Sequence, residues 1–281
     1  HVHRANRLMA SEFGYSFDAD LAAARALVAD WPVLQSIAPE APSDPVFFVT
    51  GLPRSGTTLV ETILAAHSGV AAGGEMPFLN RALAPALEGL RAGVPDPGAF
   101  AAAGARYLAA GRRRAGGTLF TDKAISTFSR VGHAATALPG ARFVILDRDP
   151  RDVGWSIYRN MFAPGSHRYA TDLATIGRYI RLHDALVAFW ADALPDRVMR
   201  ISYEALTAEP EPVIRDLVAF AGLDWEDACL APEKSGRRVE TLSFAQVRQP
   251  IGRQAVAGWR AHESDLAPLI AALETEIDLF A

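Results

Sequence analysis

The sequence has little cysteine, little lysine and no long apolar run, and each shortage excludes a class of protein. Of the 281 residues only Cys229 is a cysteine, so the chain can form no internal disulfide and offers no cysteine cluster for structural zinc. No stretch reaches the ~18 uninterrupted apolar residues of a membrane-spanning helix. The formal net charge of −4 disfavours a general nucleic-acid-binding surface. We therefore expect no membrane span, no nucleic-acid partner and a reducing, cytoplasmic compartment.

The sequence is instead rich in hydrophobic residues and in arginine. Hydrophobic residues make up 50% and charged residues 21% of the chain, a composition typical of a folded globular protein. Among the 28 basic residues, 26 are arginines and only Lys123 and Lys234 are lysines. Together with the abundant alanine, this bias is typical of GC-rich bacterial coding. A lysine that persists against the bias is a candidate for a role that arginine cannot fill.

Strand and helix patterns divide the chain near residue 45. Upstream, a broken helix and a second helix, Phe17 to Trp31, precede the proline-rich segment PEAPSDP, which cannot continue a helix. Downstream, helical segments alternate with short apolar runs typical of buried parallel strands. The runs are VFFVT (46–50), TLFTD (118–122), ARFVILD (141–147) and RVMRIS (197–202). The pattern predicts an α/β fold, with helices on both faces of a parallel sheet and a last helical stretch over 256–280.

The segment GLPRSGTT, between the first predicted strand and a helix, has the layout of a phosphate-binding loop. Gly51 and Gly56 frame four residues, as in the P-loop pattern. The backbone N–H groups of residues 55–58 would lie at a helix N-terminus, where an anion is favoured. Thr57 holds the position of the P-loop lysine, while Arg54 supplies a charge from another place. The alternative is a plain strand–turn–helix connection.

A second phosphate contact is predicted where the strand that ends at Asp147 meets the next helix. Arg148 and Ser156 stand eight positions apart across this junction, and both side chains can reach a phosphate at the carboxyl edge of a parallel sheet. Two alternatives remain open here. Asp147 could bind magnesium as in a nucleotide hydrolase or kinase, or Asp149 and Asp152 could simply favour the dipole of a solvated helix start.

The two segments together resemble the nucleotide motifs of sulfotransferases. Pro53-Arg54-Ser55-Gly56-Thr57-Thr58 is similar to the loop of that family that binds the 5′-phosphosulfate, and Arg148 to Ser156 is similar to its 3′-phosphate motif, R-x-P-x-D-x-x-x-S. The resemblance implies a P-loop-type sulfotransferase fold, 3′-phosphoadenylyl sulfate (PAPS) as donor, adenosine 3′,5′-bisphosphate (PAP) as product, and no metal. The missing P-loop lysine is then expected, because this donor has no γ-phosphate.

The layout resembles most the protein-tyrosine branch and the bacterial sulfotransferases that carry tetratricopeptide repeats before the catalytic domain. This implies that residues 1–45 are a connector from which upstream repeats have been removed, and that residues 46–281 are the catalytic domain. It also implies that Tyr203, in a Y-E-x-L segment, touches the nucleotide phosphates, with packing as the alternative. Ser243 and Arg248, in a loop similar to S-x-x-Q-V-x-K-P, are expected to contact the donor.

Sulfuryl transfer requires a base for the acceptor hydroxyl and a cation for the leaving oxygen, held in line. By resemblance to the protein-tyrosine branch, Glu75 is the expected base, with His67 and His133 as rivals. Lys123 is the expected cation, because a compact ammonium can sit on one oxygen where a planar guanidinium cannot. Related bacterial segments have the form D-K-x-P, from which this chain departs at Ala124 and the residue after it. The alternatives are an ordinary surface carboxylate and a surface lysine.

The predicted function is PAPS-dependent transfer of a sulfonate group to a hydroxyl acceptor, with Arg54 and Ser243 joining Lys123 in stabilising charge. The acceptor is left open among a tyrosyl peptide, a glycan and a small alcohol or phenol. We expect its pocket to use Met76–Leu90 and Phe162–Thr175, the second of which contains a Pro-Gly hinge typical of a lid. An exposed alanine-rich helix would also support a homodimer.

Two other functions stay open at this point. A P-loop kinase using MgATP would place Asp147 on the magnesium ion, although the loop lacks the lysine. A non-catalytic nucleotide-binding module would have lost turnover, although Glu75 and Lys123 are both present.

Overall fold

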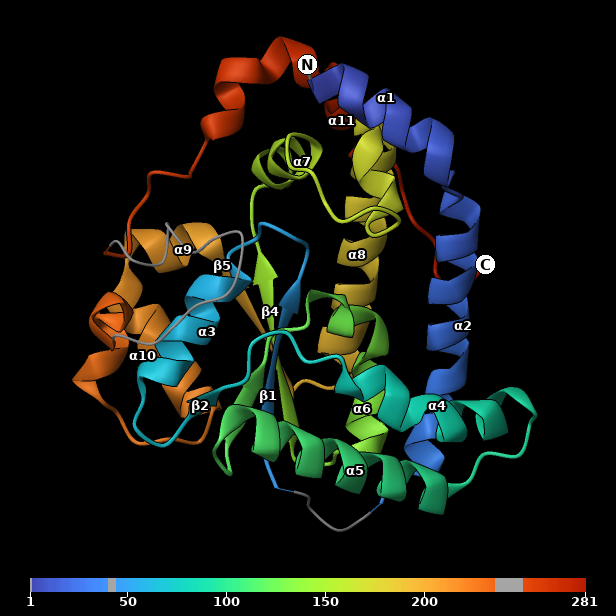
Figure 1. The fold of residues 1–281 in the computed structure, drawn as a ribbon, viewed down its shortest axis with the longest axis vertical. Helices are drawn as coiled ribbons and strands as arrows, with labels where there is room; N and C mark the ends of the chain where they lie inside the picture. The colour runs from blue at the N-terminus through green and yellow to red at the C-terminus, as the bar shows by residue number, and fades with distance from the viewer. Residues whose placement is uncertain (1, 40–43, 236–249) are drawn as a thin grey trace.

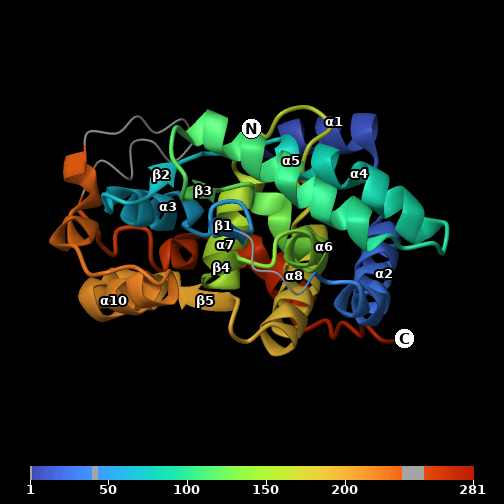
Figure 2. The same cartoon turned by 90° about the horizontal axis from the view of Figure 1, so that it is seen from below.

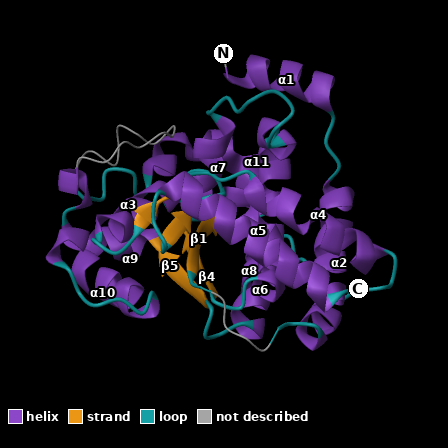
Figure 3. Ribbon diagram, turned by 60° about the horizontal axis from the view of Figure 1, so that its bottom comes forward, coloured by secondary structure: helices purple, strands orange, loops and turns teal. Residues whose placement is uncertain are grey.

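A single parallel sheet lies at the centre of the molecule. The computed structural model describes residues 2–39, 44–235 and 250–281. Within them five strands form one sheet in the order β2-β3-β1-β4-β5, and each pairing is parallel. The strands are β1 (Val46–Gly51), β2 (Ala71–Ala72), β3 (Phe120–Asp122), β4 (Ala141–Asp147) and β5 (Val198–Ser202). Helices surround this sheet (Figure 3), so the predicted α/β fold is confirmed.

The central strand β1 is covered on both faces, because its side chains alternate between two cores. Phe47 and Val49 pack with α3 and α10, and Val46 and Phe48 face the opposite core, to which α2, α4, α5, α6 and α8 contribute. Every residue of β1 is buried, which explains why the run carries no charge. Figures 1 and 2 show the two helical layers. Their helices are α2 (Phe17–Ser36), α3 (Thr57–Ala66), α4 (Phe78–Arg91), α5 (Pro97–Ala115), α6 (Val131–Ala137), α8 (Leu173–Ala193), α9 (Tyr203–Ala208) and α10 (Pro210–Phe220).

A third apolar cluster closes the carboxyl edge of the sheet. It joins Leu52 of the loop after β1 to Ile157 of α7 (Pro150–Tyr158), Ile176 of α8 and Leu269 of α11 (Ala267–Ala272). Short 3₁₀ helices connect the larger elements: η1 (Ile125–Arg130), η2 (Arg168–Thr171), η3 (Asp227–Leu230), η4 (Pro232–Ser235) and η5 (Gly258–Leu266). No helix in the described part of the chain is long and apolar enough to cross a membrane.

The N-terminal helices pack against the sheet domain. α1 (Val2–Phe13) and α2 are joined by a turn in which the Ser16 side chain caps α2 by accepting from the N–H of Ala19 at 3.2 Å. The indole of Trp31 on α2 lies edge-on to Trp190 on α8, with 5.4 Å between ring centroids. The prediction that α2 ends at Trp31 is wrong. The helix passes Pro32 and continues to Ser36, because the side chain of Leu34 is drawn into the core.

The prediction of a helix over 256–280 is only partly correct. The segment contains η5 and the short α11, and residues 275–278 are not helical. The N–H groups of Ala257 and Trp259 are bonded to the carboxylate of Asp152 on α7, at 2.7 and 2.9 Å, instead of entering a regular helix. A tertiary contact therefore overrides the local helical pattern.

The order of the strands decides where a ligand would bind. From β1 the chain moves to β2 and β3 on one side, and only later to β4 and β5 on the other. In open parallel sheets such a reversal leaves a crevice at the carboxyl ends of the strands. The segments that follow β1, β3, β4 and β5 all begin at this edge, and they carry most of the residues predicted to act.

Candidate functional site

The loop after β1 is tightly wound and ends in a helix N-terminus. Gly51 and Gly56 have φ values of 144° and 111°, and Arg54 adopts φ 71°, which is uncommon for a residue with a side chain. The Ser55 hydroxyl closes the turn by donating to the carbonyl of Leu52 at 2.8 Å. A Cβ at Gly56 would lie 2.6 Å from the Tyr203 ring, so glycine is required there. The first turn of α3 then presents N–H groups that lack intrahelical acceptors, which suits an anion.

Four predicted nucleotide-binding side chains meet beside this loop. A guanidinium nitrogen of Arg148, Nη1, donates to the carbonyl of Arg54 at 2.8 Å, and Arg54 Nε donates to the Ser156 hydroxyl at 3.3 Å. The Arg148 guanidinium also lies over the ring of Tyr203, 4.6 Å from its centroid. Residues separated by about a hundred positions are thus brought together at one edge of the sheet. Tyr203 both packs and contacts the cationic cluster.

The electrostatics of this cluster favour a bound anion. Burial, followed by the neighbouring charges of Arg148 and Arg159, lowers the pKa of Arg54. Arg148 Nε is buried and has no hydrogen-bond partner among the described residues. A phosphate would neutralise the two adjacent guanidinium groups and could accept from that nitrogen. The residues present therefore fit a phosphorylated ligand.

Asp147 is engaged elsewhere. Its carboxylate pairs with Arg200 Nε at 2.7 Å, across the neighbouring strands β4 and β5. A magnesium-binding role, as in the kinase alternative, would have to break that ion pair. Within the ranges that the structure describes, no group of three or more His, Cys, Asp or Glu side chains is arranged to hold a metal ion.

Glu75 and Lys123 form a direct ion pair. Lys123 Nζ lies 2.7 Å from Glu75 Oε1, and the lysine side chain is 2% exposed while that of the glutamate is 59% exposed. Lys123 follows β3, and the backbone N–H of Lys123 donates to the carbonyl of Gly74 at 2.8 Å. The next residues contact β1, because the Thr50 hydroxyl donates to the carbonyl of Ile125 at 2.7 Å. Lys123 is therefore no surface lysine, and the pair lies at the same edge as the phosphate loop.

Comparison with known proteins identifies the family. A model of the sulfotransferase family matches residues 45–227. The chain belongs to the sulfotransferase family. The family and the fold expected from the two nucleotide motifs are confirmed. The matched range contains Arg54, Glu75, Lys123, Arg148 and Ser156.

Several relatives share most of this chain. An uncharacterized protein of Aquifex aeolicus is 35% identical over 248 residues, which are 83% of this chain and 33% of that protein. Protein-tyrosine sulfotransferase 1 of Danio rerio is 25% identical over 233 residues, 76% of this chain and 65% of that enzyme. The chain thus spans one third and just under two thirds of the length of these two relatives.

Solved sulfotransferase structures share the fold. The sulfotransferase domain of the olefin synthase of Synechococcus PCC 7002 aligns with a TM-score of 0.57 and 23% identity, covering 80% of this chain and 90% of that domain. A sulfotransferase of Mycobacterium avium aligns with a TM-score of 0.50 and 16% identity, covering 88% of this chain and 79% of that one. At these identities the likeness concerns the fold alone.

A buried glutamate that belongs to none of the predicted motifs holds the turn before Glu75. Glu61, on α3 of the sulfotransferase fold, is 5% exposed. Its Oε1 accepts from the N–H of Gly74 at 2.9 Å and from the Thr121 hydroxyl at 3.0 Å. Burial raises the pKa of Glu61, while the charge of Lys123 lowers it. Glu61 thus connects the Gly74–Glu75 turn to β3. Its signal in the sequence is one acid inside the apolar helix TLVETILAA.

Asp122 fixes the backbone next to both members of the ion pair. Its Oδ1 accepts from the N–H of Met76 at 3.3 Å and from that of Ala124 at 2.9 Å. Its Oδ2 accepts from the hydroxyl of Tyr107 at 2.7 Å. Met76 follows Glu75 and Ala124 follows Lys123, so one carboxylate ties together the two segments that carry the ion pair. Burial raises the pKa of Asp122 to about 6.

The two rival histidines lie away from this site. His67 follows the C-terminal end of α3, about 15 Å of helix from the phosphate loop, where its Nε2 lies 2.9 Å from the carbonyl of Asp224. His133 is buried on α6, and burial lowers its pKa to about 4. In the described part of the chain, neither imidazole is hydrogen-bonded to Glu75 or Lys123.

Ser243 and Arg248 lie outside the described residues, and their roles stay predictions. The chain that follows them returns to the site. The carbonyl of Ala255 accepts from Arg148 Nη2, and Asp152 holds the N–H groups of Ala257 and Trp259. Asp152, an expected element of the 3′-phosphate motif, therefore anchors the C-terminal segment against the β4–α7 junction.

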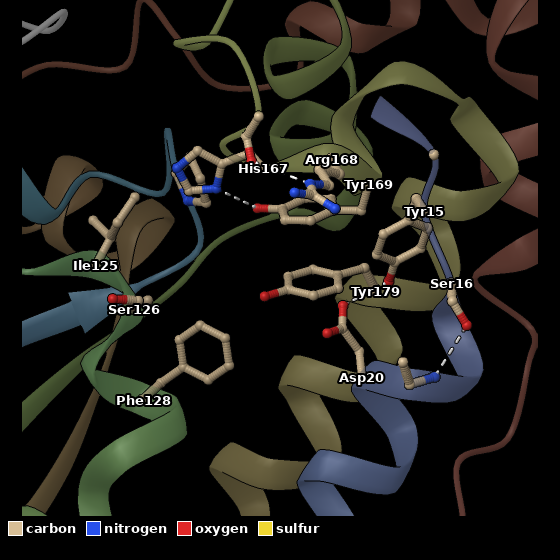
Figure 4. A pocket seen from close by; sticks show the side chains of 15 residues that line it. Tyr15, Ser16, Asp20, Ile125, Ser126, Phe128, His167, Arg168, Tyr169 and Tyr179 are labelled. Carbon is tan, nitrogen blue, oxygen red and sulfur yellow. Dashed lines mark hydrogen bonds between the residues drawn. The ribbon is translucent and has the colours of Figure 1, made fainter. Parts of the chain in front are cut away.

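A cavity of about 460 Å³ opens beside the phosphate loop (Figure 4). We call it the tyrosine pocket. Of the two segments predicted to form the acceptor pocket, Phe162–Thr175 contributes to its lining and Met76–Leu90 does not. One wall comes from the turn between α1 and α2, which the family match does not cover. Its lining is Gly14, Tyr15, Ser16, Ala19, Asp20, Gly51, Pro53, Ile125, Ser126, Phe128, Gly165, His167, Arg168, Tyr169 and Tyr179.

Proposed function

We propose that this chain transfers a sulfonate group from PAPS to a hydroxyl acceptor and releases PAP. The observation that carries the proposal is the ion pair between Glu75 and buried Lys123, at 2.7 Å, on the sheet edge that also holds Arg54, Arg148 and Ser156. A carboxylate, a desolvated ammonium and a cationic phosphate site are the groups that sulfuryl transfer requires. The named protein-tyrosine sulfotransferases among the relatives support the same chemistry.

The donor would be held at two places. The N–H groups at the start of α3, with Ser55, Thr57 and Thr58, would bind the 5′-phosphosulfate. Arg148 and Ser156 would bind the 3′-phosphate, since Arg148 Nε is a buried donor in need of an acceptor. When bound, PAPS supplies an activated sulfonate with PAP as its leaving group. Ser243 and Arg248 are proposed to complete this site.

The roles of the protein side chains follow from their charges. Glu75 accepts the proton as the acceptor O–H bond breaks and the new O–S bond forms. The bond between sulfur and the bridging oxygen breaks, and its electron pair stays on the phosphate of PAP. The Lys123 ammonium and Arg54 stabilise the charge that develops there. Exposure of the Glu75 side chain leaves its carboxylate accessible to the acceptor. Glu61 and Asp122 fix the backbone on either side of Glu75, because they accept from the N–H groups of Gly74 and Met76.

The first test is a thermal-shift comparison of PAP with ADP and ATP, with and without Mg²⁺. A ligand at 100 times its Kd stabilises the folded state by ~2.7 kcal/mol. We expect a large, Mg²⁺-independent shift with PAP. A shift with ATP that depends on Mg²⁺, together with none for PAP, would refute the proposal and favour a kinase.

The second test separates catalysis from binding with [³⁵S]PAPS and a panel of phenols and alcohols. Glu75→Gln and Lys123→Met should keep the PAP shift but lose ~10²–10³-fold in turnover. Lys234→Met is the matched control, because Lys234 is exposed and lies outside the site. Full activity in Glu75→Gln would remove Glu75 from the mechanism. PAP binding without turnover in the unmodified chain would favour the non-catalytic module.

A further inference from the structure

The tyrosine pocket has an aromatic wall. Tyr169 and Tyr179 stack with 3.6 Å between ring centroids and 9° between ring planes, and Tyr15 lies edge-on to Tyr169 at 6.4 Å. Phe128 lies across the cavity from them, and Pro53 of the phosphate loop belongs to the same lining (Figure 4). These flat faces suit a planar apolar body, and the position beside the loop suits an acceptor.

One carboxylate stands against that wall. Asp20, half-buried on α2, points toward the tyrosine rings (Figure 4), and its Oδ2 accepts from the Tyr15 hydroxyl at 2.8 Å. The charge of Asp20 contributes to raising the pKa of Tyr15, Tyr169 and Tyr179, in each case after burial. The negative faces of aromatic rings and a carboxylate together favour a cation.

The positive groups nearby are turned to other partners. Arg168 belongs to the lining but is exposed, and its Nε donates to the carbonyl of Gly165 at 3.3 Å. The charge of Arg178 opposes part of the rise in the pKa of Tyr15, but its guanidinium lies over Phe17, 4.9 Å from the ring centroid. The imidazole of His167 lies 3.3 Å from the hydroxyl of Tyr169, and burial lowers its pKa, which favours its neutral form.

The pocket also borders the segment that carries the ion-pair partner of the proposed base. The charge of Glu75 acts on His167 and partly opposes the effect of burial on the pKa of that imidazole. Lys123, the ion-pair partner of Glu75, is followed by Ile125 and Ser126, which line the cavity, while Asp20 lies among the tyrosines (Figure 4). An acceptor that spans the cavity would thus have Asp20 at one end and the segment that follows Lys123 at the other.

We propose that the tyrosine pocket binds the acceptor and selects a phenol that carries an amine, with the ring against the tyrosines, the ammonium at Asp20 and the hydroxyl toward Glu75. This inference rests on the proposed sulfotransfer and adds the substrate class. Tyr15 and Asp20 belong to the segment before residue 45, outside the family match. Selectivity then comes from the N-terminal helices, whereas the chemistry comes from residues within the match.

The experiment compares three phenols of similar shape: tyramine, neutral 4-ethylphenol and anionic 3-(4-hydroxyphenyl)propionate. With the full chain and PAPS, we expect kcat/KM to fall in that order, by about tenfold or more between tyramine and the propionate. Asp20→Asn keeps an acceptor for the Tyr15 hydroxyl but removes the charge, so it should bring the three values to within about threefold. Asp18→Asn is the matched control, because Asp18 is exposed in the same helical turn and does not line the pocket.

Binding provides a readout that does not depend on turnover. Calorimetry of the PAP complex should show tighter binding of tyramine than of 4-ethylphenol, and Asp20→Asn should abolish that difference. Equal kcat/KM for the three phenols, an unchanged preference in Asp20→Asn, or no tyramine binding to the PAP complex would each overturn the inference. Turnover of uncharged phenols in those cases would leave the proposed sulfotransfer intact, whereas failure to bind PAP would count against the sulfotransfer itself.

Discussion

At the scale of single residues, the site is built from charges that the fold buries and pairs. Lys123 is almost entirely buried, and its ion pair with Glu75 offsets part of the cost of removing the ammonium from water. Glu61 and Asp122 are buried carboxylates that fix the backbone on either side of that pair. Each carboxylate accepts from at least one backbone N–H group and one side-chain hydroxyl, so each holds neighbouring segments of the chain in place.

Asp122 makes stability depend on pH in a definite direction. Its pKa in the folded protein, about 6, lies above the ordinary 3.8. The stability that this group contributes is therefore fully present below about pH 4 and is lost as pH rises through about 6. Relative to the unmodified protein, Asp122→Asn should gain about 2–3 kcal/mol in unfolding free energy between pH 4 and pH 7. Urea unfolding at several pH values measures this difference.

Asp192→Asn is the control for that series, because Asp192 is exposed on α8. Its unfolding free energy should follow that of the unmodified protein at every pH. Parallel curves for Asp122→Asn and the unmodified protein would show that Asp122 does not titrate in this range, contrary to the expectation.

At the scale of elements, the junction of β1, its loop and α3 leaves little room for added atoms. Gly56 ends the loop at φ 111°, and Tyr203 at the start of α9 packs against the position where a Cβ would stand. The loop, α3 and α9 are therefore fitted to one another. The Arg148 guanidinium lies over the ring of the same tyrosine. Tyr203 therefore packs against both predicted phosphate sites, the loop at Gly56 and the side chain of Arg148.

Gly56→Ala should disturb both phosphate contacts. A Cβ 2.6 Å from Tyr203 Cδ2 forces the loop or the ring to move. We expect a loss of ~2 kcal/mol or more in unfolding free energy and no thermal shift with PAP. Gly93→Ala is the control, since Gly93 has φ 73° and open space around it; that variant should lose ~1 kcal/mol and keep PAP binding. A normal PAP shift in Gly56→Ala would contradict this account of the loop.

At the scale of the whole molecule, α2 and the sheet share one core. Leu27, Trp31 and Leu34 of α2 belong to the same apolar cluster as Phe48 and Phe143 of the sheet. α2 also provides Asp20 to the tyrosine pocket. The division of the chain at residue 45 into connector and catalytic domain stays a prediction that this packing makes testable.

A chain that begins at residue 46 should fail to melt cooperatively, because losing α2 uncovers Trp190 and the apolar side of α6 and α8. A chain lacking only residues 2–13 is the control, since the one buried residue of α1 is Asn6. It should keep a cooperative transition. Circular dichroism melts compare the two variants. A cooperative, unshifted transition for the chain that begins at residue 46 would establish residue 45 as a true domain boundary.

The sequence by itself determined what depends on neighbouring residues. The apolar run at 141–147 predicted β4 with the bounds that the structure has, and the two nucleotide motifs predicted the family. Both signals are local, since strand burial and a strand–loop–helix junction are expressed within about ten residues. Glu75 and Lys123 were also identified as candidates, through resemblance and through the scarcity of lysine.

Only the tertiary structure decided which of these residues meet. Glu75 and Lys123 are 48 positions apart and Arg54 and Ser156 are 102 apart, and the parallel order β2-β3-β1-β4-β5 brings their segments to one edge. A lone acid in an apolar helix marks Glu61, but no local pattern shows which segments Glu61 and Asp122 hold, or that Tyr15 and Asp20 form a wall of the tyrosine pocket. Such contacts depend on how distant segments pack, which no periodicity or short motif encodes.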